Sequence, residues 1–275
     1  MKRLITVWLP VGAGVLAAGL AALAARTWLT ERDFARDHPP PGRLVDADGA
    51  KLHVIERGTG SPPLLLIHGN PGSSLDFADT VMNELAKRHR VVAVDRPGHA
   101  WSERPTLPMT PLDQARSIHA AARTLGLERP VVVGFSYGGP VSLAYVTEFP
   151  ADVRALVLLA ALASPDDPHI GHPVQNALTW PVVGPLMAWT IGPLAAPGEI
   201  AKGLVAGFSP NPVDAAMLPK ATLLWSRPGD LLATANDWPS LDASFRPLAA
   251  RYPEIRVPVE ALPGGGDRIV GPGHE

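Results

Sequence analysis

The sequence predicts an α/β protein with a mostly parallel sheet, and two observations carry this prediction. Continuous apolar runs of strand length suit strands that are buried on both faces of a parallel sheet. Four such runs recur along the chain, at Leu64–Ile67, Val91–Val94, Val131–Val133 and Ala155–Leu159. Helix-like segments lie between them, at Leu75–Arg88, Leu112–Leu125 and Pro140–Phe149. This alternation implies right-handed crossovers that place helices on both faces of the sheet.

Composition narrows the class of protein further. The chain has 275 residues, enough for one large domain or two small ones, and 46% of them are hydrophobic, which indicates a folded protein. Its net charge of −2 and the lack of a basic run provide no electrostatic footprint for nucleic acid. The sequence has no cysteine, which excludes disulfides, thiolate metal sites and a cysteine nucleophile. Arginine outnumbers lysine 19 to 5, a bias typical of bacterial, GC-rich coding.

The first 30 residues differ from the rest and are predicted to anchor the chain in a lipid bilayer. Twenty-two uncharged residues, 4–25, follow Lys2 and Arg3. A helix of this length measures about 33 Å, enough to cross a hydrocarbon core. Trp8 and Trp28 lie near its ends, where their rings favour the membrane interface. A cleaved signal peptide is the alternative, because residues 22–24 (Ala-Leu-Ala) match a cleavage site, although the apolar run exceeds a usual signal core.

The flanking charges give little guidance on orientation. Arginines and acidic residues mix after the span, so the count of positive charges is indecisive. The short basic N-terminal tail favours a cytoplasmic start, which would place the body on the periplasmic side of a bacterial inner membrane. Residues 31–42, which end in three prolines and a glycine, are predicted to be a semi-rigid linker.

The remaining chain divides into a core and an insertion. Residues 43–57 are predicted to form a hairpin around the Asp48-Gly49 turn. Residues 43–164 and 229–275 make up the predicted core, and strand character returns at Val257–Leu262. Between them, residues 165–228 contain short helical pieces punctuated by Pro, Gly and Trp without a clear strand, which predicts an inserted helical cap.

The clearest chemical motif is Gly-Phe-Ser-Tyr-Gly-Gly at 134–139, between an apolar strand and a helical run. This is the G-x-S-x-G pattern, in which a sharp strand-to-helix turn exposes a strained serine hydroxyl. The glycines are needed because strand and helix backbones crowd each other at such a turn. Ser136 is therefore the candidate nucleophile.

A second motif, His-Gly-Asn-Pro-Gly at 68–72, follows the strand Leu64–Ile67. An oxyanion hole needs two donors that converge on the developing negative charge. The backbone N–H groups of Tyr137 and Asn70 are the candidates. Asn-Pro and Pro-Gly are also ordinary turn formers, so a purely structural loop is the alternative.

These motifs, together with Asp-Arg-Pro-Gly-His-Ala-Trp-Ser at 95–102 and Gly-Gly-Gly-Asp-Arg-Ile-Val at 264–270, resemble the α/β-hydrolase superfamily, and the anchored N-terminus resembles its membrane-associated bacterial members. The resemblance implies that Asp267 is the acid of a Ser-Asp-His triad. The loop at 68–72 is also similar to haloalkane dehalogenases and the layout to epoxide hydrolases, but both use an aspartate nucleophile where this chain has Ser136. Ala100 replaces the usual family glycine, and we expect a small adjustment of its loop.

The resemblance places the catalytic histidine beyond one further helix and strand after Asp267, and the sequence ends at Glu275. His274 lies only seven residues past Asp267, too few for that crossover. His53, His89 and His119 fall on predicted strands or helices and suit structural roles. We therefore expect the sequence to be C-terminally incomplete, nearly inactive, and destabilised by an open sheet edge.

The favoured function is serine hydrolysis of a small ester-like substrate with an apolar acyl moiety. The open alternatives are hydrolysis of a C–C bond within the same fold and a non-catalytic, membrane-tethered binding module. No organic cofactor or metal is implied. The stretch from Asp166 to His172 contains metal-ligand residue types but suits a solvated loop, and Asp166 or Asp167 is a weaker candidate for the acid. The sequence does not indicate an oligomeric state.

Overall fold

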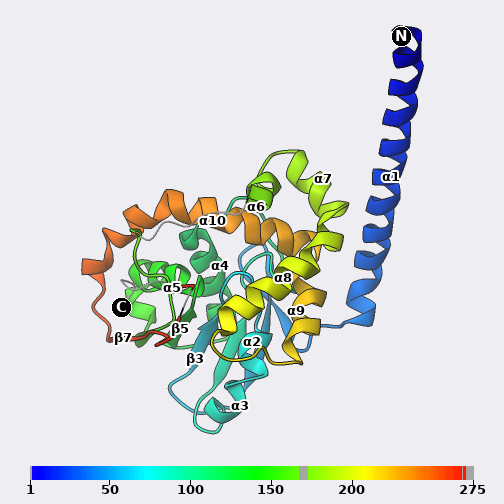
Figure 1. The fold of residues 1–275 in the computed structure, drawn as a ribbon. Helices are drawn as coiled ribbons and strands as arrows, with labels where there is room; N and C mark the ends of the chain where they lie inside the picture. The colour runs from blue at the N-terminus through cyan, green and yellow to red at the C-terminus, as the bar shows by residue number, and fades with distance from the viewer. Residues whose placement is uncertain (1, 167–172, 268, 271–275) are drawn as a thin grey trace.

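A single sheet of seven strands forms the centre of the protein in a computed structural model that describes residues 2–166, 173–267, 269 and 270 (Figure 1). The spatial order is β1-β2-β4-β3-β5-β6-β7, with β1 and β2 antiparallel to their neighbours and the others parallel. The strands are β1 (Arg43–Asp46), β2 (Lys51–Arg57), β3 (Leu64–Ile67), β4 (Val91–Val94), β5 (Val131–Phe135), β6 (Ala155–Leu159) and β7 (Val259–Leu262). The predicted hairpin and parallel sheet are confirmed.

Alternating side chains of the apolar strands supply two separate cores, one on each face of the sheet. Leu65 and Ile67 contribute to the larger core, together with α4 (Pro111–Thr124), α5 (Gly138–Glu148) and α10 (Pro228–Ala249). Leu64 and Leu66 contribute to the smaller core, under α2 (Leu75–Ala78) and α3 (Met82–Leu85). This two-sided burial is why continuous apolar runs, rather than alternating ones, form these strands.

The single helix expected over Leu75–Arg88 is wrong, because the chain forms two short helices there, α2 and α3. The break falls at Thr80 and Val81, two consecutive β-branched residues. The Thr80 hydroxyl donates to the Asp76 carbonyl at 2.6 Å, and the Thr80 amide bonds to the Phe77 carbonyl, three residues back. Side-chain hydrogen bonds of this kind compete with the regular helical pattern.

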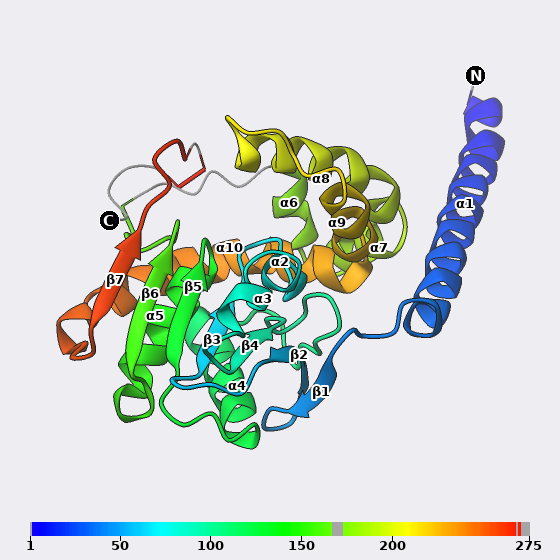
Figure 2. The same ribbon diagram turned by 90° about the horizontal axis from the view of Figure 1, so that it is seen from below.

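Four helices follow β6 and cover the body: α6 (Pro173–Leu178), α7 (Val183–Trp189), α8 (Gly192–Phe208) and α9 (Met217–Trp225). Figure 2 shows them on the side of the sheet to which the arrows of β6 and β7 point. The chain then returns through α10, a helix of 22 residues that packs against α4, α5, α6 and α7. Two short 3₁₀ turns, η1 (Pro150–Asp152) and η2 (Tyr252–Glu254), complete the described elements.

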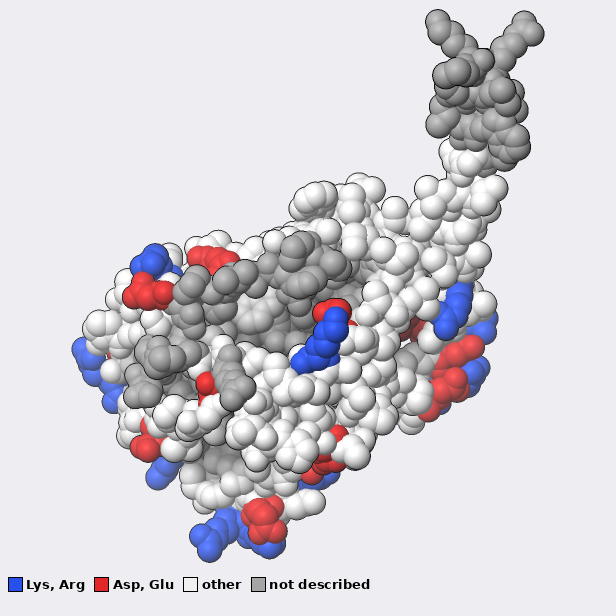
Figure 3. All heavy atoms as spheres, viewed as in Figure 1, with Lys and Arg blue, Asp and Glu red and all other residues white. Residues whose placement is uncertain are grey.

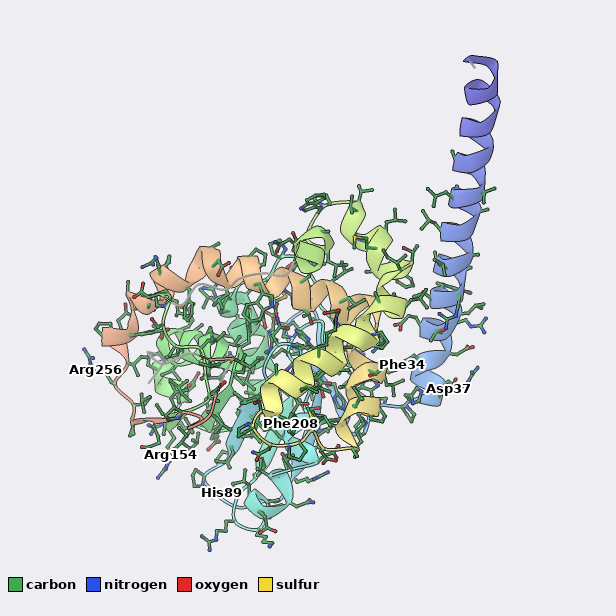
Figure 4. The ribbon with its side chains drawn as sticks, in the orientation of Figure 1. Phe34, Asp37, His89, Arg154, Phe208 and Arg256 are labelled. Atoms are coloured by element: carbon green, nitrogen blue, oxygen red, sulfur yellow. The ribbon has the colours of Figure 1, made fainter. Side chains whose placement is uncertain are left out.

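The N-terminal helix α1 (Lys2–Asp37) extends away from the body (Figure 1). Residues 31–37, expected in a linker, instead form its last two turns. Phe34 is 95% buried, in a cluster with Leu224 and Trp225 of α9 and, partly buried, Phe208 of α8 (Figure 4). Within the described residues, Gly12–Asp37 is long and apolar enough to cross a membrane.

Candidate active site

Ser136 lies on a sharp turn between β5 and α5, with a backbone φ of 51°. A non-glycine residue in this left-handed region is uncommon, and the conformation stores strain. The surrounding glycines make the turn possible. A Cβ atom on Gly134 would lie 2.2 Å from Ser142 Oγ, and one on Gly138 would lie 2.2 Å from the Ile67 carbonyl oxygen. The strand-to-helix turn predicted from the sequence is therefore present.

Backbone hydrogen bonds to α5, to β6 and to the residues that follow β6 hold Ser136 in this conformation. The Ser136 amide donates to the Leu159 carbonyl at 3.1 Å. Its own carbonyl accepts from the amides of Gly139 at 2.9 Å and Leu162 at 3.1 Å. Three bonds from neighbouring segments thus offset the strain of the turn.

The loop at 68–72 approaches the Ser136 side chain directly. A Cβ atom on Gly69 would lie 3.0 Å from Ser136 Cβ and 3.3 Å from its Oγ, so only glycine leaves the hydroxyl unobstructed on this side. In the described part of the chain, the backbone amides of Asn70 and Tyr137 donate to no backbone carbonyl outside helices and strands. The structure therefore brings Ser136 and the two predicted oxyanion donors into the same part of the molecule.

The side chains of Asn70 and Tyr137 are both tied to α10. Asn70 Nδ2 donates to the Thr234 carbonyl at 3.0 Å, and the Tyr137 hydroxyl donates to the Asp237 carbonyl at 2.8 Å. Tyr137 is completely buried, and burial raises the pKa of its hydroxyl well above the ordinary value, so it remains a neutral donor. A helix distant in sequence thereby fixes the position of both amides.

A buried ionic network, which was not predicted from the sequence, lies beneath this loop. Its centre is the carboxylate of Asp237, which accepts from Arg96 at 2.7 Å, Arg104 at 2.9 Å and Gln114 at 3.0 Å, and lies 3.3 Å from His99 Nε2. Burial alone would raise the pKa of Asp237, but the charge of Arg96 and the hydrogen bond with His99 lower it below the ordinary range. The carboxylate therefore stays ionised.

Arg96 connects this network to the candidate oxyanion loop. Its guanidinium donates to the carbonyls of His68 at 3.1 Å and Gly69 at 2.9 Å, and lies 4.6 Å from the centre of the Tyr137 ring. Arg96 and Asp237 are both fully buried, so neither charge is screened by water. Charge-assisted hydrogen bonds from Arg96 thus hold the loop in place.

The nearby histidines are engaged in structural contacts. His68 Nδ1 donates to the Gly69 carbonyl at 2.8 Å, and its Nε2 accepts from the Arg96 amide at 2.8 Å. Burial and the Arg96 charge lower the pKa of His68 well below 6.5, and the same two causes lower that of His99 to about 4. His53 is paired with Asp95 at 2.7 Å. These contacts hold the three rings within the buried part of the structure, and the low pKa values of His68 and His99 make those two rings weak bases.

Asp267 follows the end of β7, on the same edge of the sheet as Ser136. Phe135, Leu159 and Leu262 lie in register on β5, β6 and β7, and Asp267 comes five residues after Leu262. Its Oδ1 accepts from the amides of Ile269 at 2.8 Å and Val270 at 3.0 Å. The alternative acid Asp166 is exposed and pairs with Arg246 at 3.0 Å, whereas Asp167 and His274 lie outside the described residues.

Ala100, where the family motif has glycine, keeps a left-handed conformation with φ of 48°. Alanine pays about 1 kcal/mol for this conformation. Its amide donates to Asp230 at 2.8 Å, and its carbonyl accepts from Arg227 at 2.6 Å. The glycine-like conformation is thus retained by contacts to the start of α10.

Among the described residues, no group of three or more His, Asp or Glu side chains is arranged to hold a metal ion. Most of the stretch from Asp166 to His172 lies outside those residues.

Asp76 should make stability fall as the pH rises. Burial raises the pKa of its carboxyl to about 7, above the unfolded value of about 3.9. The folded state therefore binds the proton more tightly, and its stabilisation is present below about pH 4 and lost as the pH rises through about 7. Asp76→Asn, which cannot ionise, should raise the free energy of unfolding at pH 8 by about 2 kcal/mol, allowing for partial exposure of the site.

Urea unfolding of the detergent-solubilised chain at pH 4 and pH 8 measures this effect, with Asp48→Asn, at an exposed turn position between β1 and β2, as control. An equal shift at both pH values for Asp76→Asn would show that the carboxyl does not titrate in this window.

A mostly parallel sheet with a left-handed serine after strand β5, covered by an inserted group of helices, defines an α/β-hydrolase architecture. The chain belongs to the alpha/beta hydrolase fold family, whose model matches residues 62–200. The family assignment and the fold predicted from the sequence are thereby confirmed.

Two curated relatives differ in the chemistry that their names describe. The chain is 38% identical over 130 residues to haloalkane dehalogenase 2 of Mycobacterium tuberculosis, covering 46% of this chain and 45% of the relative. It is 35% identical over 134 residues to 2-hydroxy-6-oxo-2,4-heptadienoate hydrolase of Pseudomonas putida, covering 44% and 45%. The matches span slightly less than half the length of these relatives.

A solved membrane phospholipase A, described as a bacterial virulence factor, matches nearly the whole chain. The alignment covers 99% of this chain and 85% of that one, at 26% identity and a TM-score of 0.65. The epoxide hydrolase CorEH shares the fold, with a TM-score of 0.65 at 20% identity over 82% of both chains.

Proposed function

We propose that the protein is a serine hydrolase that cleaves ester-like substrates with an apolar acyl moiety through an acyl-enzyme at Ser136. The observation that carries this proposal is the left-handed Ser136 at the strand-to-helix turn, with Gly69 against its side chain. A backbone this strained is retained where the surrounding structure supports a function.

In the proposed reaction, a histidine base removes the proton of Ser136 Oγ as the oxygen attacks the substrate carbonyl carbon. The amides of Asn70 and Tyr137 stabilise the resulting oxyanion. The base returns the proton to the leaving alcohol, and water then releases the acid from the acyl-enzyme. Asp267 would orient the base and stabilise its charged form. The base itself is not assigned to a described residue.

The ties from Asn70 and Tyr137 to α10 support this scheme. An oxyanion hole is effective when its donors are fixed before the charge develops. Here the fixing bonds come from buried carbonyls of Thr234 and Asp237, and the Arg96 guanidinium holds the adjacent loop carbonyls. The geometry of the two amides is therefore built into the folded state.

Hydrolysis of a C–C bond is the second candidate, and the Pseudomonas relative, named as a hydrolase of a 2-hydroxy-6-oxo dienoate, favours it. Dehalogenation receives less support. Displacement of halide by the Ser136 hydroxyl would leave an ether on the protein, which water does not readily hydrolyse, whereas the aspartate nucleophile of haloalkane dehalogenases forms a hydrolysable ester. A membrane-tethered binding module is the third candidate.

We further propose that α1 anchors the protein in a bacterial inner membrane, with the hydrolase body on the periplasmic side. The apolar run and the near-complete match to a membrane phospholipase support an anchor. Retention of the full-length protein, with its N-terminus intact, in membranes washed at alkaline pH tests this against a cleaved signal peptide.

Covalent labelling tests the catalytic proposal. The complete gene product, in its membrane, is treated with a fluorophosphonate probe, alongside Ser136→Ala and the exposed control Ser61→Ala. Labelling of the wild type and Ser61→Ala but not Ser136→Ala supports the serine hydrolase. Labelling that persists in Ser136→Ala contradicts it, and fatty-acid binding without labelling favours the binding module.

Substrate panels then separate the reactions. Nitrophenyl esters of increasing chain length and a 2-hydroxy-6-oxo dienoate are offered to the unlabelled protein, with Ser136→Ala as the inactive control. Turnover of the dienoate at a higher kcat/KM than any ester would replace the ester proposal with the C–C reaction.

A further inference from the structure

The cap contains a long uncharged segment. Residues 168–198 contain no Lys, Arg, Asp or Glu. Residues 180–186, named here the cap tip, comprise the end of the α6–α7 connection and the first turn of α7, and they expose several large apolar side chains to the outside. Trp180 is 59% exposed, Val182 79% and Leu186 48%, and the prolines beside them are exposed as well. Apolar surface of this extent on a protein usually marks an interaction site.

The backbone of the cap tip is strained in a way that exposes Val182. Its φ of 70° and ψ of −54° place this β-branched residue at the centre of a γ-turn, closed by the Val183 amide donating to the Pro181 carbonyl at 2.8 Å. This turn is rare and costly for valine. The turn is also closely packed, since a Cβ on Gly184 would lie 2.0 Å from the Leu178 carbonyl oxygen. The fold thus holds an apolar side chain outward at a cost.

Helix α1 has a fixed orientation relative to the cap. Residues Leu20, Leu23, Thr27, Glu31 and Phe34 recur at helical spacing and are partly or fully buried, whereas residues 12–19 are exposed. The two carboxylate oxygens of Glu31 accept from Arg227, with a shortest distance of 2.9 Å, and α7 packs beside α1. The angle between α1 and the cap is therefore set by side-chain contacts.

The contact with α1 extends into its uncharged segment. Leu20 lies six residues before Arg26, the first charge after the apolar run, which is about 9 Å along the helix. Figure 1 shows α6 and α7 on the side toward which the N-terminal half of α1 extends. In Figure 3 the surface beside α1 on this side is white, and charged residues gather at the foot of α1.

We propose that the cap tip enters the bilayer beside α1, in the leaflet that faces the hydrolase body, as a second point of membrane contact. This inference rests on the proposed anchor. Where the apolar run of α1 lies in hydrocarbon, the attached cap tip comes to the level of the membrane interface. Trp180 suits that level, because its ring has an apolar body and a polar N–H group. A bilayer also accepts the surface without the polar rim that protein interfaces usually have.

Site-directed fluorescence tests the proposal, and the absence of native cysteine makes single labelling sites simple to introduce. An environment-sensitive fluorophore is attached at Val182→Cys in the full chain, reconstituted in phosphatidylethanolamine–phosphatidylglycerol vesicles that contain lipids with a nitroxide quencher in the acyl chain. The matched control is Val81→Cys, an exposed valine (45%) before α3, at the opposite end of the body (Figure 1). Val15→Cys, in α1 and 70% exposed, reports on the anchor itself.

Strong quenching at Val15 and Val182, several-fold above that at Val81, is the expected result. Quenching at Val15 with Val182 equal to Val81 would overturn the cap contact while leaving the anchor intact. A blue-shifted emission at Val182 without quenching would show burial against a second copy of the chain, which also overturns it. No quenching at Val15 would overturn the anchor and the cap contact together.

Because a cysteine in the strained γ-turn can alter the local fold, Leu186→Cys on the first turns of α7 provides a second reporter. Its fluorophore is expected to be quenched as strongly as the one at Val182. Quenching only as weak as that at Val81 would count against the proposal.

Discussion

Replacing Asp237 with alanine is expected to lower the free energy of unfolding by about 3–5 kcal/mol. The substitution leaves Arg96 buried without its counter-charge, and it removes acceptors from Arg104 and Gln114. An unpaired buried charge costs several kcal/mol because it cannot recover its hydration. The same change should loosen the loop at 68–72, whose carbonyls Arg96 binds. Fluorophosphonate labelling of Ser136 should therefore slow in the fraction that stays folded.

Urea unfolding of the full chain in detergent, followed by tryptophan fluorescence, measures the stability change. Asp242→Ala is the matched control, since Asp242 is an exposed carboxylate on the same helix. Because the folded pKa of Asp237 is depressed, its stabilisation is present above the unfolded value of about 3.9 and declines as the pH falls below it. The difference in free energy of unfolding between the wild type and Asp237→Ala should consequently become smaller at acidic pH. Equal stability of the Asp237 and Asp242 variants at pH 7 would refute the network as described.

Gly138→Ala should destabilise the protein by about 2–4 kcal/mol and abolish labelling of Ser136. The added Cβ would lie 2.2 Å from the Ile67 carbonyl oxygen and 2.9 Å from that of His68. Both are backbone atoms at the end of β3, so relief requires movement of the strand end and of the loop that carries Asn70. A steric conflict of this kind damages the fold and the candidate oxyanion hole together.

Gly203→Ala on α8 is the matched control for this substitution. Its Cβ would meet no atom within 4 Å, and alanine favours a helix over glycine by about 0.5–1 kcal/mol. We expect this variant to gain stability and to label like the wild type. Similar losses in both variants would indicate that the crowding at Gly138 is relieved elsewhere.

The central fold could be predicted because its signals are local. The apolar runs at 64–67 and 155–159 are short, and the structure has strands over the same residues, fully buried in the first and alternately buried and partly buried in the second. The turn at Ser136 was predictable for the same reason. The crowded turn requires glycine two positions before and after the serine, and these glycines are visible in the sequence. The split between α2 and α3 was not, because it depends on how the Thr80 hydroxyl satisfies a carbonyl.

The buried network was invisible in the sequence because its partners are far apart. Asp237 and Arg96 are separated by 141 positions, and an aspartate in an uninterpreted segment gives no sign of burial. Helix α10 itself was missed, since Pro239 and Pro247 interrupt the pattern that would predict a long helix. Sequence analysis therefore found the residues proposed to react, whereas only the folded chain reveals the groups that hold them.

Arg227 connects the N-terminal helix α1 to a loop of the hydrolase body. Its guanidinium binds Glu31 of α1, stacks over Phe34 at 3.8 Å and donates to the carbonyl of Ala100, in the loop after β4. A single side chain thus links the helix proposed to lie in the bilayer with the loop that packs on Asp230. Bilayer thickness affects the tilt of such a helix. A change in tilt would then be transmitted through Arg227 to the loop after β4.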